Sequence, residues 1–157
     1  MTTRKLAVIS SGLSQPSSTR MLADRLTQAV VRRLEEQGVE VEVELVELRD
    51  TAQDVTNNLL TGFANPRLEA VIEKITTADG LIAVTPIFTT SYSGLFKSFI
   101  DVLDPQSLNE MPVLRKEFAT NRPAHVPDAP THASLVVARD AADLVKAADD
   151  AAQKAVK

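Results

Sequence analysis

Two nearly continuous apolar runs, each followed by a hydroxyl-rich loop and then by residues at helical spacing, constrain this 157-residue chain most. The runs are Leu6–Ile9 and Gly80–Thr85, and neither shows the apolar–polar alternation of a strand with one wet face. Strands without that alternation are typical of parallel sheets, because helices cover both faces of such sheets. The pattern therefore predicts a buried strand at each place, with a helix after each loop.

Other segments continue this alternation of strand and helix. Apolar residues at helical spacing predict helices from Thr19 to Gly38, from Pro66 to Ile75 and from Leu95 to Leu103. Strict alternation over Val39–Leu45 predicts a strand near a sheet edge with one solvated face. The segment 49–65 is polar with weak periodicity, so we expect a long loop there with room for a short helix. The order predicts an α/β fold with a doubly wound parallel sheet.

The last third of the chain follows this pattern less closely. Met111–Leu114 is a candidate fourth strand, and Ser134–Ala138 is a candidate for one more. The stretch 115–132 is polar and contains three prolines, which indicates a loop. Asp140–Lys157 is rich in alanine and is expected to be a terminal helix. We accordingly divide the chain into a core, 1–114, and a divergent tail, 115–157.

Charge and composition exclude several classes of function. A net charge of −4 without a cluster of Lys or Arg argues against a nucleic-acid partner. The absence of cysteine excludes disulfides, thiolate catalysis and thiolate metal sites. The amino-terminal apolar run is too short for a signal peptide, and no stretch has the length of a membrane span. The cytoplasm is therefore the default expectation for its compartment.

The two hydroxyl-rich loops are the candidate site. In an open α/β sheet, ligands bind beyond the carboxyl ends of the strands, where the strand order reverses. In the flavodoxin-like order 2-1-3-4-5 the first and third strands are neighbours. The loops SSGLSQPSST and TPIFTTSYSG are then expected to face each other across a crevice.

The first loop leads into a helix N-terminus, where free N–H groups and the helix dipole attract an anion. Ser17, Ser18 and Thr19 add donors, and Arg20 is the one cation close by in sequence. Because the loop has neither a Walker A lysine nor a GxGxxG pattern, a terminal monophosphate is the expected ligand group. The alternative is that these hydroxyls only cap the helix or keep the loop flexible.

The second loop could hold a planar ring system. Pro86 stiffens its entry, Gly94 permits a tight turn, and Phe88 and Tyr92 are available to cover the face of a ring. The alternative interpretation places Phe88 in the core and Tyr92 at the surface.

Both loops resemble motifs of the NADPH-dependent FMN reductases. The residues Ser11, Gly12, Ser14, Ser17 and Thr19 resemble the family's GSxRxxSxT loop. The second loop and the helix after it resemble PEYNxxxPGxLKNxID through Pro86, Gly94, Lys97, Ile100 and Asp101. Ser14 stands where the family has arginine, Ser11 and Gly12 replace a Gly-Ser pair, and Phe88 replaces tyrosine. A fourth departure is that RKEFATNRPAHVPDAP stands where the family has a Gly/Ala/Thr-rich loop that closes over the flavin, so the alternatives are a shortened chain, a missing segment and a divergent tail. The resemblance covers about the first 114 residues.

The resemblance implies a flavodoxin-like fold and an FMN site. Ser17 and Thr19 would bind the phosphate together with Ser11, Gly12, Ser14 and Ser18, whereas Pro86, Ile87, Phe88 and Thr89 would line the isoalloxazine ring. It also implies hydride transfer from NADPH or NADH to the flavin. No acid or base side chain is needed for that reaction, because the cofactor carries the chemistry.

Partners and alternatives follow from the same resemblance. A flavin-dependent monooxygenase is a candidate acceptor of the electrons. A homodimer or homotetramer is expected from the family's habit and from the apolar helix that carries Phe96 and Phe99. The competing hypotheses are an FMN-binding electron carrier without nicotinamide turnover, and a quinone or azo-dye reductase on the same flavin.

Two other groups of residues are a candidate metal site and a candidate ion pair. His125, Asp128 and His132 are conceivable metal ligands, but their proline-rich setting lacks the spacing of a metal site and favours a solvated loop. Lys97 and Asp101 are predicted to form a surface ion pair one helical turn apart.

Overall fold

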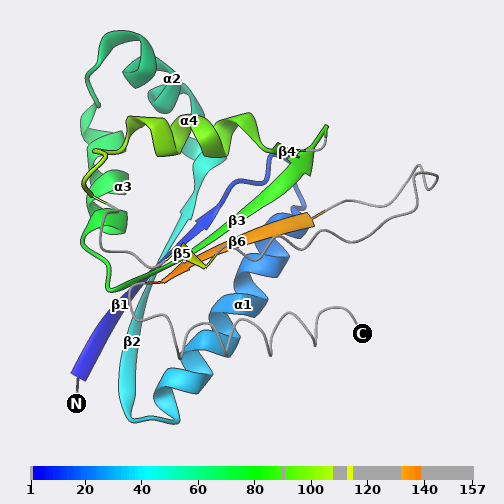
Figure 1. Ribbon diagram of the computed structural model, residues 1–157, viewed down its shortest axis with the longest axis vertical. Helices are drawn as coiled ribbons and strands as arrows, with labels where there is room; N and C mark the ends of the chain where they lie inside the picture. The colour runs from blue at the N-terminus through cyan, green and yellow to red at the C-terminus, as the bar shows by residue number, and fades with distance from the viewer. Residues whose placement is uncertain (1, 90, 108–112, 115–131, 139–157) are drawn as a thin grey trace, which may run out of the picture.

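A twisted sheet with helices on both faces organises the chain (Figure 1). The computed structural model describes residues 2–89, 91–107, 113–114 and 132–138. The main sheet has the strand order β2-β1-β3-β6-β5, and β4 pairs with the far end of β3. The strands are β1 (Thr2–Ser10), β2 (Val39–Glu47), β3 (Gly80–Phe88), β4 (Ser91–Tyr92), β5 (Val113–Leu114) and β6 (His132–Ala138).

The helices begin and end where their capping residues permit. They are α1 (Ser18–Glu35), the 3-10 turn η1 (Leu48–Thr51), α2 (Ala52–Thr61), α3 (Pro66–Thr76) and α4 (Gly94–Val102). Ser17, Asn65 and Ser93 cap α1, α3 and α4 by accepting a hydrogen bond from a backbone N–H in the first turn. The capped helices lie where the apolar spacing predicts them.

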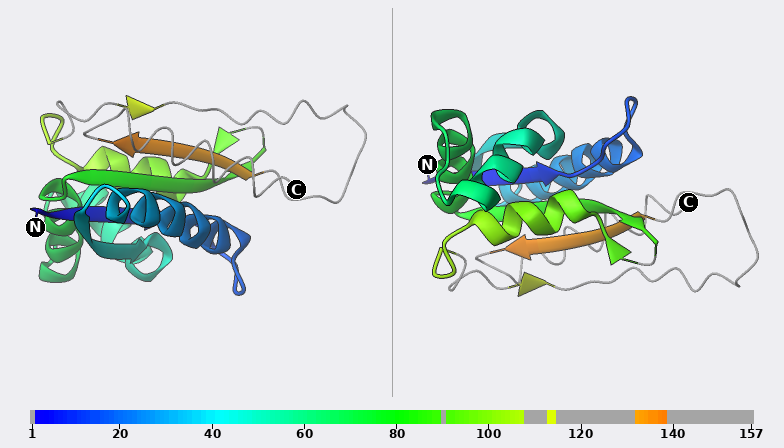
Figure 2. Two further views of the ribbon diagram at one scale, coloured as in Figure 1. Left: turned by 90° about the horizontal axis from the view of Figure 1, so that it is seen from below. Right: turned by 90° about the horizontal axis from the view of Figure 1, so that it is seen from above.

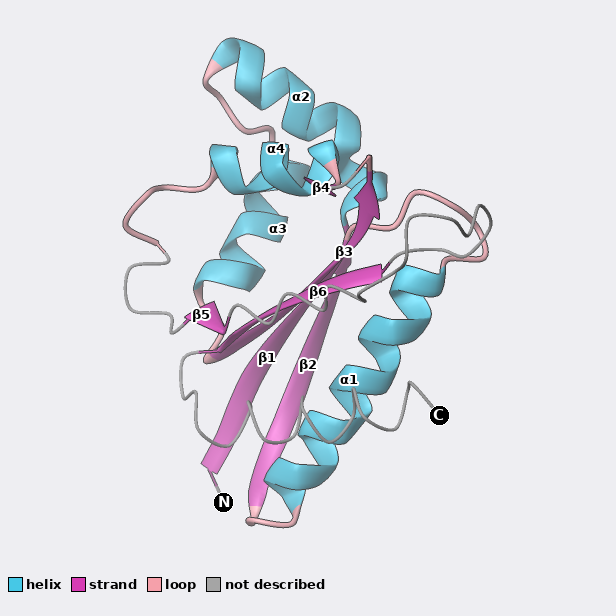
Figure 3. Cartoon of the chain, turned by 45° about the vertical axis from the view of Figure 1, so that its right-hand side comes forward, coloured by secondary structure: helices cyan, strands magenta, loops and turns pink. Residues whose placement is uncertain are grey.

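Alternating residues of the central strands pack against different helices. Leu6, Val8 and Ile82 belong to one cluster with residues of α1, and Ala7, Ile9 and Leu81 belong to another with residues of α2, α3 and α4. Figure 3 shows α1 on one side of the sheet and the other three helices on the opposite side. This arrangement confirms the doubly wound α/β fold and explains why the central strands are apolar on both faces.

The strand order agrees with the prediction up to β3 and departs from it afterwards. β1 lies between β2 and β3 and is parallel to both. The place beside β3 belongs to β6, which runs antiparallel to it over seven residue pairs, and β5 pairs antiparallel to β6 (Figure 2). The expectation of a parallel sheet is thus wrong for these two strands. A strand that follows a long connection can pair in either direction, and the apolar pattern does not encode that direction.

The segment 49–65, expected to be a long loop with room for a short helix, is mostly helical. It contains the end of η1 and the ten-residue helix α2, which ends at Gly62 in the left-handed conformation. Val55 is fully buried and fixes α2 against the core, whereas Leu60 and Phe63 are about 80% exposed. One buried apolar anchor in a polar helix gives little periodicity, which is why the sequence pattern indicated no more than a short helix within a loop.

Phe96 and Phe99, which suggested a self-association surface, instead face the core. Their exposed fractions are 5% and 0%, and both belong to the cluster beneath α4. The predicted ion pair between Lys97 and Asp101 is present on the outer face of the same helix.

Two kinds of feature are absent from the part of the chain that the structure describes. No helix there combines the length and the apolar character needed to cross a lipid bilayer. Nor do these residues contain a group of three His, Cys, Asp or Glu side chains suited to a metal ion. His125 and Asp128 of the weighed metal hypothesis lie outside the described residues, as does the expected helix 140–157.

Candidate functional site

The two hydroxyl-rich loops leave the same edge of the sheet from neighbouring strands. Ser10 at the end of β1 is opposite Val84 of β3. The next residue, Ser11, donates both its backbone N–H and its hydroxyl to the Val84 carbonyl, at 3.0 Å each. The predicted juxtaposition of the loops is therefore correct. The hydroxyl proton of Ser11 is used in this contact between β1 and β3 and is not available to a ligand.

The first loop folds back tightly over the N-terminus of α1. A Cβ atom at Gly12 would lie 2.1 Å from Ser17 Oγ and 3.0 Å from Thr19 Cβ. Ser17 Oγ in turn accepts a hydrogen bond from the Arg20 N–H at 3.2 Å. Glycine is required at residue 12 because the loop passes this close to the first turn of the helix.

The hydroxyl groups of this loop differ in what they can still bind. Ser17 accepts from the Arg20 backbone, which leaves its own proton for an incoming acceptor. Ser14 and Ser18 are exposed. Thr19 is buried at 3% exposure, and its hydroxyl has no hydrogen-bond partner among the described residues.

A buried hydroxyl without a partner is costly, and a ligand or ordered water at the site would offset that cost. Ser10 is a second buried hydroxyl, at 2% exposure, that finds no partner within the described part of the chain. Ser10 is the first residue of the predicted loop SSGLSQPSST but is not among its predicted ligand residues, and the structure places it at the end of β1. The helix N-terminus, the Gly12 turn and these two hydroxyls together suit a small anionic group.

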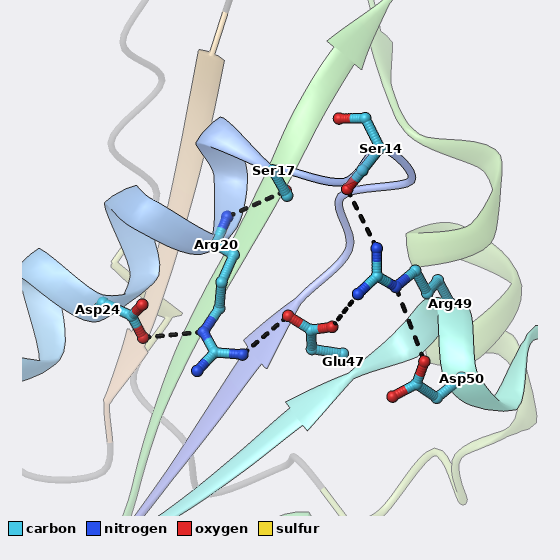
Figure 4. Close-up of polar contacts among 7 residues, drawn as sticks. All are labelled: Ser14, Ser17, Arg20, Asp24, Glu47, Arg49 and Asp50. Atoms are coloured by element: carbon cyan, nitrogen blue, oxygen red, sulfur yellow. Dashed lines mark hydrogen bonds and ion pairs between the residues drawn. The ribbon is translucent and has the colours of Figure 1, made fainter.

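Five charged side chains, Arg20, Asp24, Glu47, Arg49 and Asp50, form a chain of ion pairs beside the first loop (Figure 4). Arg20 binds Asp24 at 2.9 Å and Glu47 at 2.8 Å, and Arg49 binds the other Glu47 oxygen at 2.6 Å. Arg49 also donates to the Ser14 carbonyl at 3.1 Å. Arg20 is therefore not the one cation near the loop. Arg49 lies 35 residues beyond Ser14 in the chain, so local spacing around the loop could not identify it.

Glu47 is the shared partner of both arginines. The hydrogen bond from Arg20, assisted by the charge of Arg49, holds the pKa of Glu47 below its usual range, although partial burial opposes the shift. Hydrogen bonds to Asp24 and Glu47 raise the pKa of Arg20. The carboxylate thus remains ionised and keeps both guanidinium groups beside the loop.

The second loop is shorter than predicted, because much of it is strand. β3 continues through Pro86, Ile87 and Phe88, and Ser91–Tyr92 turns back to pair with its end. Along β3, burial falls from Pro86, which is buried, through Ile87, which is half-buried, to Phe88, which is 48% exposed. Thr89 follows with a φ of 46°, an uncommon conformation for a β-branched residue. The alternative interpretation is therefore wrong in placing Phe88 in the core and right in placing Tyr92 at the surface, and the covering of a ring face by either side chain stays a prediction.

Polar contacts fix the base of this second loop. The Thr85 hydroxyl accepts a hydrogen bond from the Ser93 N–H at 3.1 Å, and Ser93 caps α4. Tyr92 packs edge-on against Phe96 with ring centroids 6.2 Å apart. The exposed aromatic face of the hairpin therefore rests on a rigid base next to the carboxyl end of β1.

A model of the family described as NADPH-dependent FMN reductase matches residues 4–129. The chain belongs to the NADPH-dependent FMN reductase family. The match includes both loops of the site and all of the parallel strands described above.

Relatives and solved structures agree with this placement. An FMN reductase (NADPH) of Pseudomonas aeruginosa is 34% identical over 110 residues, which cover 70% of this chain and 56% of that protein. A crystal structure of an oxidoreductase from Corynebacterium diphtheriae has a TM-score of 0.69 at 40% identity, covering 71% and 62% of the two chains. The apo form of an NADH:FMN oxidoreductase has a TM-score of 0.57 at 28% identity, covering 67% and 52%.

This FMN reductase family member therefore spans a little over half the length of its relative from Pseudomonas aeruginosa. Its two site loops fall within the described residues, with the exception of residue 90. The family's flavodoxin-like fold is consistent with the parallel arrangement of β2, β1 and β3.

Proposed function

We propose that this chain binds FMN at the two loops and accepts hydride from NADPH or NADH through the bound flavin. The observation that supports the proposal most directly is the Gly12 turn over the N-terminus of α1. It has room for no side chain at residue 12, and the hydroxyl of Thr19 beneath it lacks a partner within the described residues. These features fit a terminal phosphate, which accepts several hydrogen bonds at once.

Each loop has a distinct part in this proposal. Ser17, Ser18, Thr19 and the amides at the start of α1 hold the phosphate, and Gly12 lets the backbone approach it. Pro86, Ile87, Phe88 and Thr89 lie on the neighbouring strand, where the flavin ring would rest against the backbone and the exposed Phe88. FMN, when bound, supplies the ring that takes up hydride. The protein orients the flavin and the nicotinamide and sets the electrostatic field around them, and hydride transfer needs no general acid or base from the protein.

The phosphate assignment is tested with two flavins that differ in one group. In Ser17→Ala we expect FMN binding to weaken by about 1–2 kcal/mol, because one hydrogen bond to a charged group is lost. Riboflavin, which lacks the phosphate, should bind almost as before. Asn65→Ala removes the matching cap of α3 and serves as the control for general destabilisation. Equal losses for FMN and riboflavin in a fluorescence titration would contradict the assignment.

The reductase activity is tested by steady-state oxidation of NADPH and of NADH with added FMN. Turnover that depends on FMN is the expected result. Binding of FMN without turnover would instead identify an electron carrier, and turnover only with an added quinone or azo dye would identify a reductase for those acceptors. A flavin-dependent monooxygenase is the proposed physiological acceptor, since such enzymes consume reduced flavin.

A further inference from the structure

Two guanidinium groups border the first loop, and they are directed differently (Figure 4). Arg20 uses Nε for Asp24 and Nη1 for Glu47, so both contacts are with carboxylates. Arg49 uses Nη2 for Glu47 and lies with Nε 3.7 Å from Asp50, but it directs Nη1 to the carbonyl oxygen of Ser14 at 3.1 Å. Arg49 is thus the cation that contacts the backbone of the loop.

The setting of Arg49 favours a fixed side chain. The side chain of Arg49 is 22% exposed and that of Glu47 is 18% exposed, compared with 36% for Arg20. Glu47 stands at the end of β2 and Arg49 in the turn that follows, so the pair is attached to the sheet rather than to a flexible segment. A guanidinium held in this way loses little conformational entropy when it binds an anion.

A neutral acceptor already occupies the remaining face of Arg49. In the orientation that satisfies its hydrogen bonds, the Gln15 amide places its oxygen 3.1 Å from Arg49 Nη1 and also in contact with Nη2. Gln15 is exposed at the tip of the loop, so its side chain can be displaced at small cost. The contact shows that both terminal nitrogens of Arg49 can donate hydrogen bonds to one oxygen atom of the first loop.

We propose that Arg49, rather than Arg20, is the cation that binds the phosphate of the ligand, with a phosphate oxygen replacing the Gln15 amide oxygen. The inference rests on the proposed function and names the charged residue of that same site. Ser14 cannot supply a positive charge, and Arg49 brings one to its carbonyl from a distant part of the chain. Glu47 acts as a positioning residue, because it orients the guanidinium without touching the ligand.

The test compares two variants that each remove one positive charge. Arg49→Met and Arg20→Met change the net charge equally and differ in which guanidinium is lost. We expect Arg49→Met to weaken FMN binding by about 10- to 100-fold, the effect of losing hydrogen bonds between charged groups. Riboflavin binding to the same variant should change far less. Arg20→Met should retain most of the FMN affinity.

A third variant and a salt series complete the design. Arg49→Lys keeps the charge without the two-pronged donor geometry and should fall between wild type and Arg49→Met. The salt dependence of FMN binding should be reduced in Arg49→Met and unchanged in Arg20→Met. Circular dichroism and the melting temperature verify that each variant is folded.

The outcomes separate this inference from the proposed function. If wild type binds FMN and Arg49→Met binds it equally well, or if Arg20→Met loses as much affinity, Arg49 does not have this role. Equal losses of FMN and riboflavin in Arg49→Met would likewise overturn it, since the residue would then only shape the loop. If wild type binds neither flavin, the proposed function itself fails.

Discussion

At the scale of single residues, the site depends on a residue without a side chain as well as on side chains that can bind a ligand. Gly12 is the clearest case, because Ser17 and Thr19 occupy the space that its Cβ would need. Residues of this kind carry a local signal, because Gly12 in the loop, Ser17 at the cap of α1 and Thr19 in its first turn are close in sequence. Arg49 carries no such signal, because it lies 35 positions beyond Ser14 in the chain.

Replacing Gly12 by alanine tests this crowding. The new methyl group would overlap Ser17 Oγ, so we expect a loss of about 1–3 kcal/mol in the free energy of unfolding. FMN binding should weaken as well, because the loop has to move away from α1. Gly94→Ala is the matched control: nothing lies within 4 Å of its Cβ position. Equal melting temperatures for Gly12→Ala and wild type would refute the prediction.

The shared carboxylate of Glu47 predicts a pH dependence of stability. The pKa of Glu47 in the folded chain is lowered from the usual value of 4.5, so its contribution is complete above that pH and is lost as the pH falls below it. We expect Glu47→Gln to reduce the free energy of unfolding by about 1–2 kcal/mol at pH 7, between the ranges for exposed and buried pairs.

The difference between Glu47→Gln and wild type should shrink as the pH is lowered from 5 towards 3, the approximate range in which a carboxylate of lowered pKa takes up its proton. Chemical denaturation at several pH values measures it. A constant difference across this range would show that the charge of Glu47 is not what stabilises the folded chain.

At the scale of elements, the helices were predictable where many apolar side chains are buried and unpredictable where few are. α1 and α4 bury regular stripes, and their boundaries lie within a few residues of those expected. α2 is held against the core by Val55 and ends at the left-handed Gly62. A single buried residue and a terminating glycine do not produce a periodic apolar pattern. The sequence predicts a loop at the end of β3 where the structure has a hairpin, because a two-residue strand is too short to show an alternating pattern.

The expected self-association has to involve other residues than Phe96 and Phe99. Leu60 and Phe63, near the C-terminal end of α2, expose 81% and 80% of their surface. We expect light scattering to give more than the monomer mass at micromolar concentration. The double variant Leu60→Ser with Phe63→Ser should lower that mass, because it removes exposed apolar area. A monomer mass for wild type with FMN present would exclude the homo-oligomer.

At the scale of the whole molecule, the site depends on contacts between segments that are far apart in sequence. The 69 residues 11–79 separate β1 from β3, and Arg49 contacts the first loop from the turn that follows β2. The sequence predicts that the two loops are neighbours, because two buried strands that are each followed by a helix favour parallel pairing with crossover connections. The direction of β6 did not follow, because its pairing depends on a connection that has no periodic pattern.

The position of β6 has a consequence for synthesis on the ribosome. β3 has one free edge, rich in apolar residues, until the segment 132–138 emerges some fifty residues later. An unpaired apolar strand can recruit a strand from another chain, so the nascent protein is vulnerable to aggregation during that interval. A chain that stops at Leu114 should consequently accumulate as insoluble protein, whereas one extended through residue 138 should remain soluble when both are expressed alike.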